Sequence, residues 1–202
     1  LGIKSRLDKV KEYRLTSKRA DTVKYADYPN RFTNSTYREE ECLVVPIVSS
    51  ALRKYLPVGF ENNDVVILNS AQVVYGCDLC NFGIIESYIH MVWVKAVSGK
   101  LKNDIRYSST LCYNTFPFPS ISDTKKSEIE EAATNVLLVR ENYPEKTLAD
   151  LYDPEKMPED LRAAHEELDA IVESCYPGAP FPNDEARLEC LFKLYEKMTA
   201  NK

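Results

Sequence analysis

The chain has 202 residues, of which 44% are hydrophobic and 28% are charged. This length and composition are typical of a globular protein with a buried core and exclude a disordered or fibrous chain. The net charge of −5 argues against a nucleic-acid binder, whose surface is usually basic.

The charge is unevenly distributed along the chain. Residues 1–120 carry 16 Lys and Arg against 12 Asp and Glu, a balance of +4, whereas residues 121–202 carry 10 against 19, a balance of −9. The overall charge therefore does not exclude nucleic-acid binding by the first 120 residues. No run of eighteen apolar residues occurs, so we expect no transmembrane helix and no membrane partner.

The first forty residues predict a helix and a connector. Apolar side chains in residues 3–20 fall near one helical face, and basic side chains occupy the others. Residues 28–41 are polar and rich in turn-forming residues, which predicts a connector. Because the chain lacks an initiator methionine and opens directly on this helix, we expect a fragment of a longer protein without a secretory leader. The apolar face consists of Ile3, Leu7, Val10 and Leu15.

Residues 42–98 predict a sheet followed by a helix. Three segments rich in Val and Ile, at 42–49, 54–60 and 64–75, are separated by Pro, Gly and Asn and predict strands. Asn81 is the expected N-cap of a helix over residues 83–98. The expected core face consists of Ile85, Tyr88, Ile89, Val92, Trp93, Ala96 and Val97, and it leaves Glu86, His90 and Lys95 outside.

Residues 121–202 predict a small helical domain. Three amphipathic helices are expected, at 123–142, 158–175 and 183–200, and the last two begin with acidic residues as helix N-termini do. Together with the preceding sheet and helix, they predict an α+β fold. Their apolar stripes contain Ile129, Ala133, Val136 and Leu137, then Leu161, Ala164, Leu168 and Val172, then Leu188, Leu191, Phe192 and Tyr195.

The sequence contains no motif of an autonomous enzyme. It has no glycine-rich phosphate loop, no G-x-S-x-G elbow and no H-E-x-x-H zinc motif. Cys77 and Cys80 have the spacing of one zinc-binding pair, but a structural zinc site needs four ligands and no second pair follows, so we expect packed thiols and no metal. His165 is expected to be solvated or partly covered on its helix. The six cysteines are expected to be reduced, as in a cytoplasmic protein.

One segment has the composition of a nucleic-acid contact. Four basic residues lie within twelve positions, and Asn103, Tyr107, Ser108 and Asn114 are interleaved with them. Lys and Arg neutralise phosphates, Arg also binds guanine edges, and Asn binds adenine. An ordinary solvated loop accounts for the same composition equally well. The four basic residues are Lys95, Lys100, Lys102 and Arg106.

A longer pattern in the same region resembles a known family. Residues 90–119, HMVWVKAVSGKLKNDIRYSSTLCYNTFPFP, closely resemble the target-recognition region of type IIG (Mme-type) restriction–modification enzymes and of their methylase-only relatives. Phe118 stands where the family often has Trp, so an aromatic side chain is kept. The residues that match the family pattern are His90, Met91, Trp93, Val97, Gly99, Leu101, Asp104, Arg106, Tyr107, Ser108, Tyr113, Asn114, Phe116, Pro117 and Pro119.

The resemblance extends over the whole chain and implies its organisation. Residues 1–34 resemble a helix and connector that leave a methyltransferase domain, 35–120 an α/β target-recognition domain, and 121–202 a C-terminal helical domain. In the family, an upstream domain binds S-adenosylmethionine and methylates adenine. Its glycine-rich cofactor motif and N-P-P-Y/F tetrapeptide do not occur here, so this fragment is expected to hold no cofactor and to be inactive alone.

The resemblance implies that the fragment selects the DNA sequence. Its expected partners are double-stranded DNA and the methyltransferase domain of the same chain, and the presence of a nuclease stays open. The alternative is a docking module without base contacts. The acidic helices are expected to pack on the recognition or the catalytic domain because DNA would repel them. The expected DNA-binding residues are Lys95, Lys100, Lys102, Asn103, Asp104, Arg106, Tyr107 and Ser108, with Arg14, Lys18 and Arg19 as possible backbone contacts.

Two details of these contacts stay open. Alternation along an extended segment would place Lys102, Asp104 and Arg106 on one side, nearest to the bases, where Asp accepts from cytosine and Arg donates to guanine. Asp104 and Arg106 could equally form an internal salt bridge that shapes the loop. For the three basic residues of the first helix, the alternative is that they only keep the helix in solution.

Overall fold

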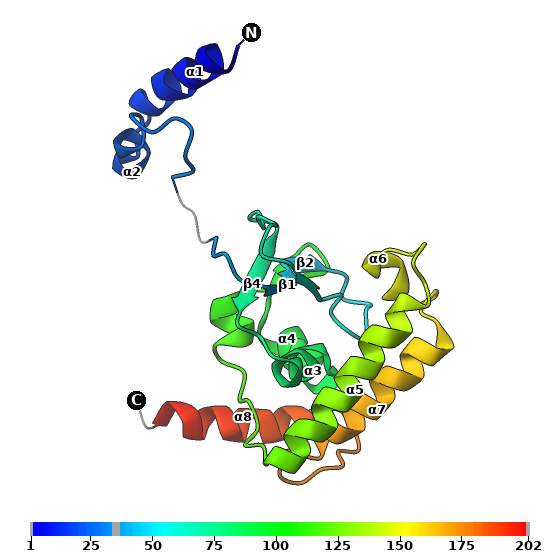
Figure 1. Cartoon of the computed structure of the whole chain (residues 1–202). Coiled ribbons are helices and arrows are strands. Elements are labelled where there is room, and N and C mark those ends of the chain that lie inside the picture. Colours follow the sequence, from blue (N-terminus) through cyan, green and yellow to red (C-terminus); the bar gives the residue numbers. More distant parts are fainter. Residues whose placement is uncertain (1, 34–36, 201–202) are drawn as a thin grey trace. The chain divides into compact units, whose positions relative to one another are not determined.

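The computed structural model describes residues 2–33 and 37–200, which belong to two compact units, Leu1–Arg38 and Glu39–Lys202 (Figure 1). The boundary predicted between residues 34 and 35 lies outside the described residues. Within the described ranges, every helix is too short or too polar to cross a membrane.

The first unit contains two helices where the sequence predicted one. Helix α1 spans Ile3–Leu15, and helix α2 spans Ala20–Lys24 after an extended residue at Arg19. Ala26 is the one buried side chain among the described residues of this unit. The apolar residues noted in α1 are not buried within the unit, since Ile3 is 79% exposed and Leu15 is 55% exposed.

The second unit begins with two small antiparallel sheets. In one sheet the central strand β1 pairs with β3 and β4, and Leu43 lies opposite Phe60 and Val74. In the other, β6 is central between β2 and β5. The strands are β1 (Cys42–Pro46), β2 (Val48–Ser49), β3 (Gly59–Glu61), β4 (Ala71–Tyr75), β5 (Gly99–Leu101) and β6 (Asp104–Arg106).

Ile47 joins the two sheets and divides the predicted strand 42–49. Its N–H donates to the carbonyl of Ser70, just before β4, at 3.1 Å. Its carbonyl accepts from the N–H of Tyr107, just after β6, at 2.7 Å. The backbone therefore leaves one ladder and enters the other at this residue.

The other two predicted strands are shorter in the structure. Most of 54–60 is a loop in which Tyr55, Leu56 and Val58 are buried, and the Tyr55 hydroxyl donates to Asp169 at 2.8 Å. Their apolar composition reflects burial against the C-terminal helices rather than strand pairing, which shows how strongly β-propensity depends on context.

Two helices replace the predicted helix over 83–98. They are α3 (Leu79–Glu86) and α4 (Tyr88–Val97). The N-cap of α3 is Asp78 rather than Asn81, because the Asp78 carboxylate accepts from the Asn81 N–H at 2.8 Å. The backbone is extended at Ser87, which ends one helix and caps the next.

The break at Ser87 changes which side chains face the core. Helical spacing counted through this residue placed Glu86 and His90 on the outside, but both are fully buried. The carboxylate of Asp169 stabilises the break, since it accepts from the first N–H of α4, at Tyr88, at 2.7 Å.

The three predicted C-terminal helices are confirmed, and a short helix α6 is added. The predicted stripe of α7 is buried, as are Ile129, Ala133 and Val136 of α5, whereas α8 buries only Leu191. The helices are α5 (Asp123–Glu141), α6 (Leu148–Leu151), α7 (Glu159–Glu173) and α8 (Asp184–Ala200).

These helices pack on the α/β part, so that residues 39–202 form one compact unit. Helices α5 and α7 lie side by side against α3, and α8 packs on α4 (Figure 1). The expectation that the acidic helices pack on protein is confirmed, since α5 and α7 contact α3 and α8 contacts α4. The predicted α+β class is also confirmed, with small antiparallel sheets and a helical C-terminal region.

A buried polar cluster connects the C-terminal helices to α3. Arg140 of α5 and Glu86 of α3 form an ion pair at 2.5 Å, and the Arg140 guanidinium also donates to the Tyr152 hydroxyl. That hydroxyl lies 2.8 Å from Nε2 of His165, whose ring stacks on Tyr55 at a centroid distance of 4.0 Å. The prediction that His165 is solvated or partly covered is wrong, because this packing buries it completely.

Candidate nucleic-acid interface

The predicted basic segment forms a β-hairpin that leaves the end of helix α4. Strand β5 follows Ser98, and strand β6 returns antiparallel to it with Leu101 opposite Asp104. The two-residue turn is Lys102–Asn103, and Lys102 has the left-handed φ of 57° that such a turn requires. The hairpin is therefore a narrow, regular projection rather than an irregular loop.

The hairpin brings seven of the eight predicted contact residues to the surface together. The side chains of Lys100, Lys102, Asn103 and Arg106 are exposed. Lys95, Asp104 and Ser108 are half-buried, and burial lowers the pKa of Lys95. The cluster carries four cations against the single carboxylate of Asp104, so it attracts an anionic partner.

Tyr107 is the exception, and the structure corrects its predicted role. Its side chain is only 2% exposed, and its hydroxyl lies 3.2 Å from Nε2 of His90 on α4. Burial lowers the pKa of His90 to about 3, so the imidazole is neutral. Tyr107 belongs to the core beneath the hairpin, and too little of its side chain is exposed to contact a base or phosphate.

A pocket of about 320 Å³ adjoins the hairpin. It brings Gln72 of β4 beside Arg106, although 34 positions separate them in the sequence. Sequence reasoning missed Gln72, and the one local signal was a polar residue inside an apolar strand. An amide and a guanidinium can each form two hydrogen bonds with a base edge. The pocket is lined by Ile47, Gln72, Gly99, Arg106, Tyr107, Ser108 and Leu111.

The structure bears on both alternatives for Lys102, Asp104 and Arg106. Asp104 and Arg106 are two positions apart on β6, so they share one face, whereas Lys102 lies in the turn and does not continue the alternation. Among the residues that the structure describes, no ion pair joins Asp104 to Arg106. Both side chains are therefore available to an external partner.

Arg14 of helix α1 has an internal role. Its guanidinium donates to the carbonyl oxygens of Tyr25 and Tyr28 at 2.8 Å each, and to that of Arg31 at 2.6 Å. These bonds tie α1 to the segment after α2. Lys18 and Arg19 are exposed, and their contact with a DNA backbone stays a prediction.

Replacing Arg14 with alanine is expected to loosen the first unit, which has almost no apolar core. Three carbonyl oxygens, one half-buried and two exposed, would lose a charged donor, and a hydrogen bond to a charged group contributes at most about 1.5–3 kcal/mol. Hydrogen exchange of residues 20–33 should become at least ten-fold faster, while residues 39–200 keep their protection. Arg19→Ala is the matched control, and equal exchange in both variants would contradict this role.

Cys77 and Cys80 have the surroundings of protonated, packed thiols. Burial raises the pKa of Cys77 to about 12 and that of Cys80 to about 11. In the described part of the chain, no three His, Cys, Asp or Glu side chains come together as metal ligands. His90, the first histidine that follows them in the sequence, lies at hydrogen-bond distance from Tyr107.

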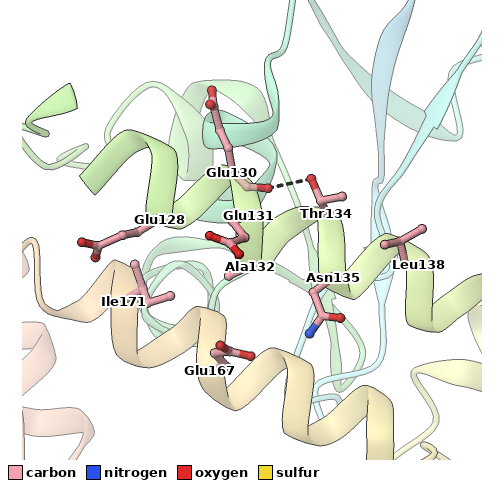
Figure 2. Close-up of a pocket in the computed structure, with 9 residues that line it drawn as sticks. All are labelled: Glu128, Glu130, Glu131, Ala132, Thr134, Asn135, Leu138, Glu167 and Ile171. Carbon is pink, nitrogen blue, oxygen red and sulfur yellow. Dashed lines mark hydrogen bonds between the residues drawn. The ribbon is translucent and has the colours of Figure 1, made fainter. Parts of the chain in front are cut away.

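A second pocket, of about 670 Å³, lies between helices α5 and α7. Figure 2 shows Asn135 of α5 pointing toward Glu167 of α7, with Ile171 further along the same helix. Four glutamates line this pocket, so its potential repels a phosphate backbone. The acidic pocket and the basic hairpin differ in charge, and only the hairpin is suited to DNA.

The sequence of the chain matches two family profiles. One, described as the MmeI target recognition domain, matches residues 2–120, and the other, the MmeI C-terminal domain, matches residues 121–201. This chain belongs to the MmeI family. The hairpin, its pocket and Tyr107 all lie within the part that matches the target recognition domain.

Two relatives support the assignment to the MmeI family. DNA methyltransferase A of Bacillus subtilis (strain 168) is 45% identical over 197 residues, or 98% of this chain. A solved structure of the type IIL restriction-modification enzyme MmeI in complex with DNA matches 98% of this chain at 36% identity, with a TM-score of 0.93. The chain spans 22% of the first relative and 26% of the second.

Proposed function

We propose that this chain is the DNA sequence-recognition part of a bifunctional type II restriction–modification enzyme or of an adenine-specific DNA methyltransferase. The observation that carries the proposal is the exposed β5–β6 hairpin, which presents Lys100, Lys102, Asn103 and Arg106 next to a pocket that contains Gln72. The MmeI relative solved in complex with DNA supports duplex DNA as the partner.

The hairpin suits the major groove, which admits a two-stranded β-ribbon. Lys100 and Lys95 neutralise phosphates and set the register of the duplex without reading its sequence. Arg106 and Asp104, on one face of β6, read base edges together with Lys102 of the turn. Gln72 joins them from β4, so the contact surface combines both sheets.

The rest of the longer protein supplies the chemistry. Its upstream domain binds S-adenosylmethionine and methylates an adenine that is flipped out of the duplex held by this chain. The chain itself contributes no catalytic residue. The protein acts in the cytoplasm, where restriction–modification enzymes meet DNA. The longer protein is of type IIG.

The test compares two hairpin variants of the full-length protein by sequencing the sites that it methylates. Arg106→Ala is expected to relax the preference at one base position, at a cost of about 1–3 kcal/mol. Lys100→Ala is expected to weaken binding to all sequences alike and to reduce the salt slope of binding by about one.

Lys193→Ala on α8 is the control for these variants. Lys193 is exposed and forms a helix-surface pair with Glu189 at 2.5 Å. It should leave both affinity and preference unchanged. If Arg106→Ala, Asp104→Ala and Lys102→Ala all keep the parental preference in folded protein, the hairpin does not read bases.

A docking module is the second candidate, and the exposed apolar side chains of α1 favour it. Ile3, Tyr13 and Leu15 are 55–79% exposed and suit a protein surface. Substituting Tyr13 and Leu15 with serine separates the two functions. Loss of domain association with retained DNA preference would assign docking to α1 alone, whereas unchanged association would exclude docking through these two side chains.

A further inference from the structure

The base of the hairpin enters the core at one residue. Arg106 is exposed, but the next residue, Tyr107, is almost completely buried. The Tyr107 N–H donates to the Ile47 carbonyl at 2.7 Å, and its hydroxyl meets His90 at 3.2 Å. The returning strand is thus fastened both to the sheet and to helix α4.

Helix α4, to which the hairpin is bonded, is itself held in place by its packing in the core. Its Trp93 packs against Phe192 and Tyr195 of α8, with ring centroids 5.1 and 5.7 Å apart, and donates to the Thr115 hydroxyl at 3.3 Å. His90 lies three residues before Trp93, nearly one turn earlier, and meets the ring of Phe116 edge-on at 4.5 Å. The hydrogen bond between Tyr107 and His90 therefore connects the hairpin to this packed part of the core.

Apart from the fully buried side chain of Ile105 in β6, few other contacts hold the hairpin. All three residues of β5 are exposed, and β5 lies at the edge of its sheet. Strand β6 pairs with β2 over two residues only, Val48 opposite Arg106 and Ser49 opposite Ile105. So short a ladder restrains rotation weakly, and each additional bond at the base has a large effect on where the exposed side chains lie.

The buried pair of Tyr107 and His90 leaves one of its hydrogen-bonding atoms without a partner. His90 Nδ1 is buried and has no hydrogen-bond partner among the described residues. An unpaired buried polar atom lowers stability, and two apolar rings would avoid that loss. A hydrogen bond, unlike an apolar contact, fixes a direction between its partners.

We propose that Tyr107 and His90 are a positioning pair that sets the orientation of the β5–β6 hairpin and thereby the sharpness of target discrimination. This inference rests on the proposed function. Without the bond, the hairpin samples more orientations, so that Arg106 and Asp104 also reach the edges of mismatched bases. The affinity for phosphates changes little, because a point charge tolerates such displacements.

Tyr107→Phe in the full-length protein tests the pair. Tyr176→Phe is the matched control, since Tyr176 is also buried and its hydroxyl also makes one 3.2 Å bond, to the Pro117 carbonyl. Both variants are expected to lose similar thermal stability. Only Tyr107→Phe should reduce the ratio of methylation rates between the target and single-mismatch sites, by about five-fold, as expected for one lost hydrogen bond.

The His90→Phe variant and the double variant complete the test. Each should lower the ratio to the level of Tyr107→Phe, since either change removes the same bond, and His90→Phe keeps the test open if Tyr107→Phe is poorly folded. Equal ratios in Tyr107→Phe, His90→Phe and Tyr176→Phe would overturn the inference. Arg106→Ala separates the two failures: if it changes the preference while Tyr107→Phe does not, only the positioning pair is wrong. If Arg106→Ala, Asp104→Ala and Lys102→Ala all leave the preference unchanged as well, the proposed reading of bases by the hairpin fails.

Discussion

Replacing Arg140 with methionine is expected to lower the free energy of unfolding of the Glu39–Lys202 unit by about 3–5 kcal/mol, because it removes the partner of a buried charge. Glu86 is completely buried, and Arg140 lies 2.5 Å from its carboxylate. Burial raises the pKa of Glu86, and the Arg140 guanidinium opposes this shift. The same guanidinium also donates to the Val58 carbonyl at 3.0 Å, so the substitution also removes a hydrogen bond that holds the loop containing Val58.

Urea unfolding of the 202-residue chain at neutral pH measures this effect. Arg162→Met on α7 is the control, since its partner Glu159 is 93% exposed and such surface pairs contribute about 0–1 kcal/mol. The double variant Glu86→Leu with Arg140→Met should recover much of the stability, because no charge is then left unpaired. A loss below about 1 kcal/mol for Arg140→Met would show that the pair is not the connection between α3 and α5.

Gly83→Ala is expected to destabilise the same unit by about 1–3 kcal/mol, the usual effect of overpacking a core. On the solvent-exposed face of a helix, replacing glycine with alanine stabilises the protein, because alanine is the better helix former. Here a β-carbon on Gly83 would lie 2.8 Å from Cγ2 of Ile129, 3.2 Å from Cδ1 of Leu168 and 3.3 Å from Cβ of Ala133. The glycine therefore permits the close approach of α3 to α5 and α7.

Gly99→Ala is the matched control for this substitution. A β-carbon there would meet the Cβ of Arg106 at an ordinary 3.9 Å, so stability should change by no more than about 0.5 kcal/mol. Truncation of Ile129 to alanine should cost less in the Gly83→Ala background than in the parent, since it makes room for the added methyl group. A stabilised Gly83→Ala protein would contradict the close packing of these helices.

The parts of the molecule that follow from local periodicity were predictable. The helices of residues 121–202 and the buried stripe of α7 depend on side-chain spacing within one helix, which a sequence displays directly. The cations of the hairpin lie within twelve consecutive positions, so their clustering needed no tertiary information. The uneven charge of the chain likewise indicated which part suits an anionic partner.

Other features depended on contacts between distant residues. Ser87 interrupts a helix because Asp169, 82 positions later, accepts from the next N–H, and the break turns Glu86 and His90 into the core. Gln72 joins Arg106 only through the pairing of strands. For the same reason, the sequence by itself determined that residues 95–108 carry the charge for a nucleic-acid contact, whereas the tertiary structure decided which of them face outward. Tyr107 is of a residue type that often contacts nucleic acids, but it is buried against α4 and supports the hairpin from within the core. Solvent exposure is a property of the fold and not of the residue type.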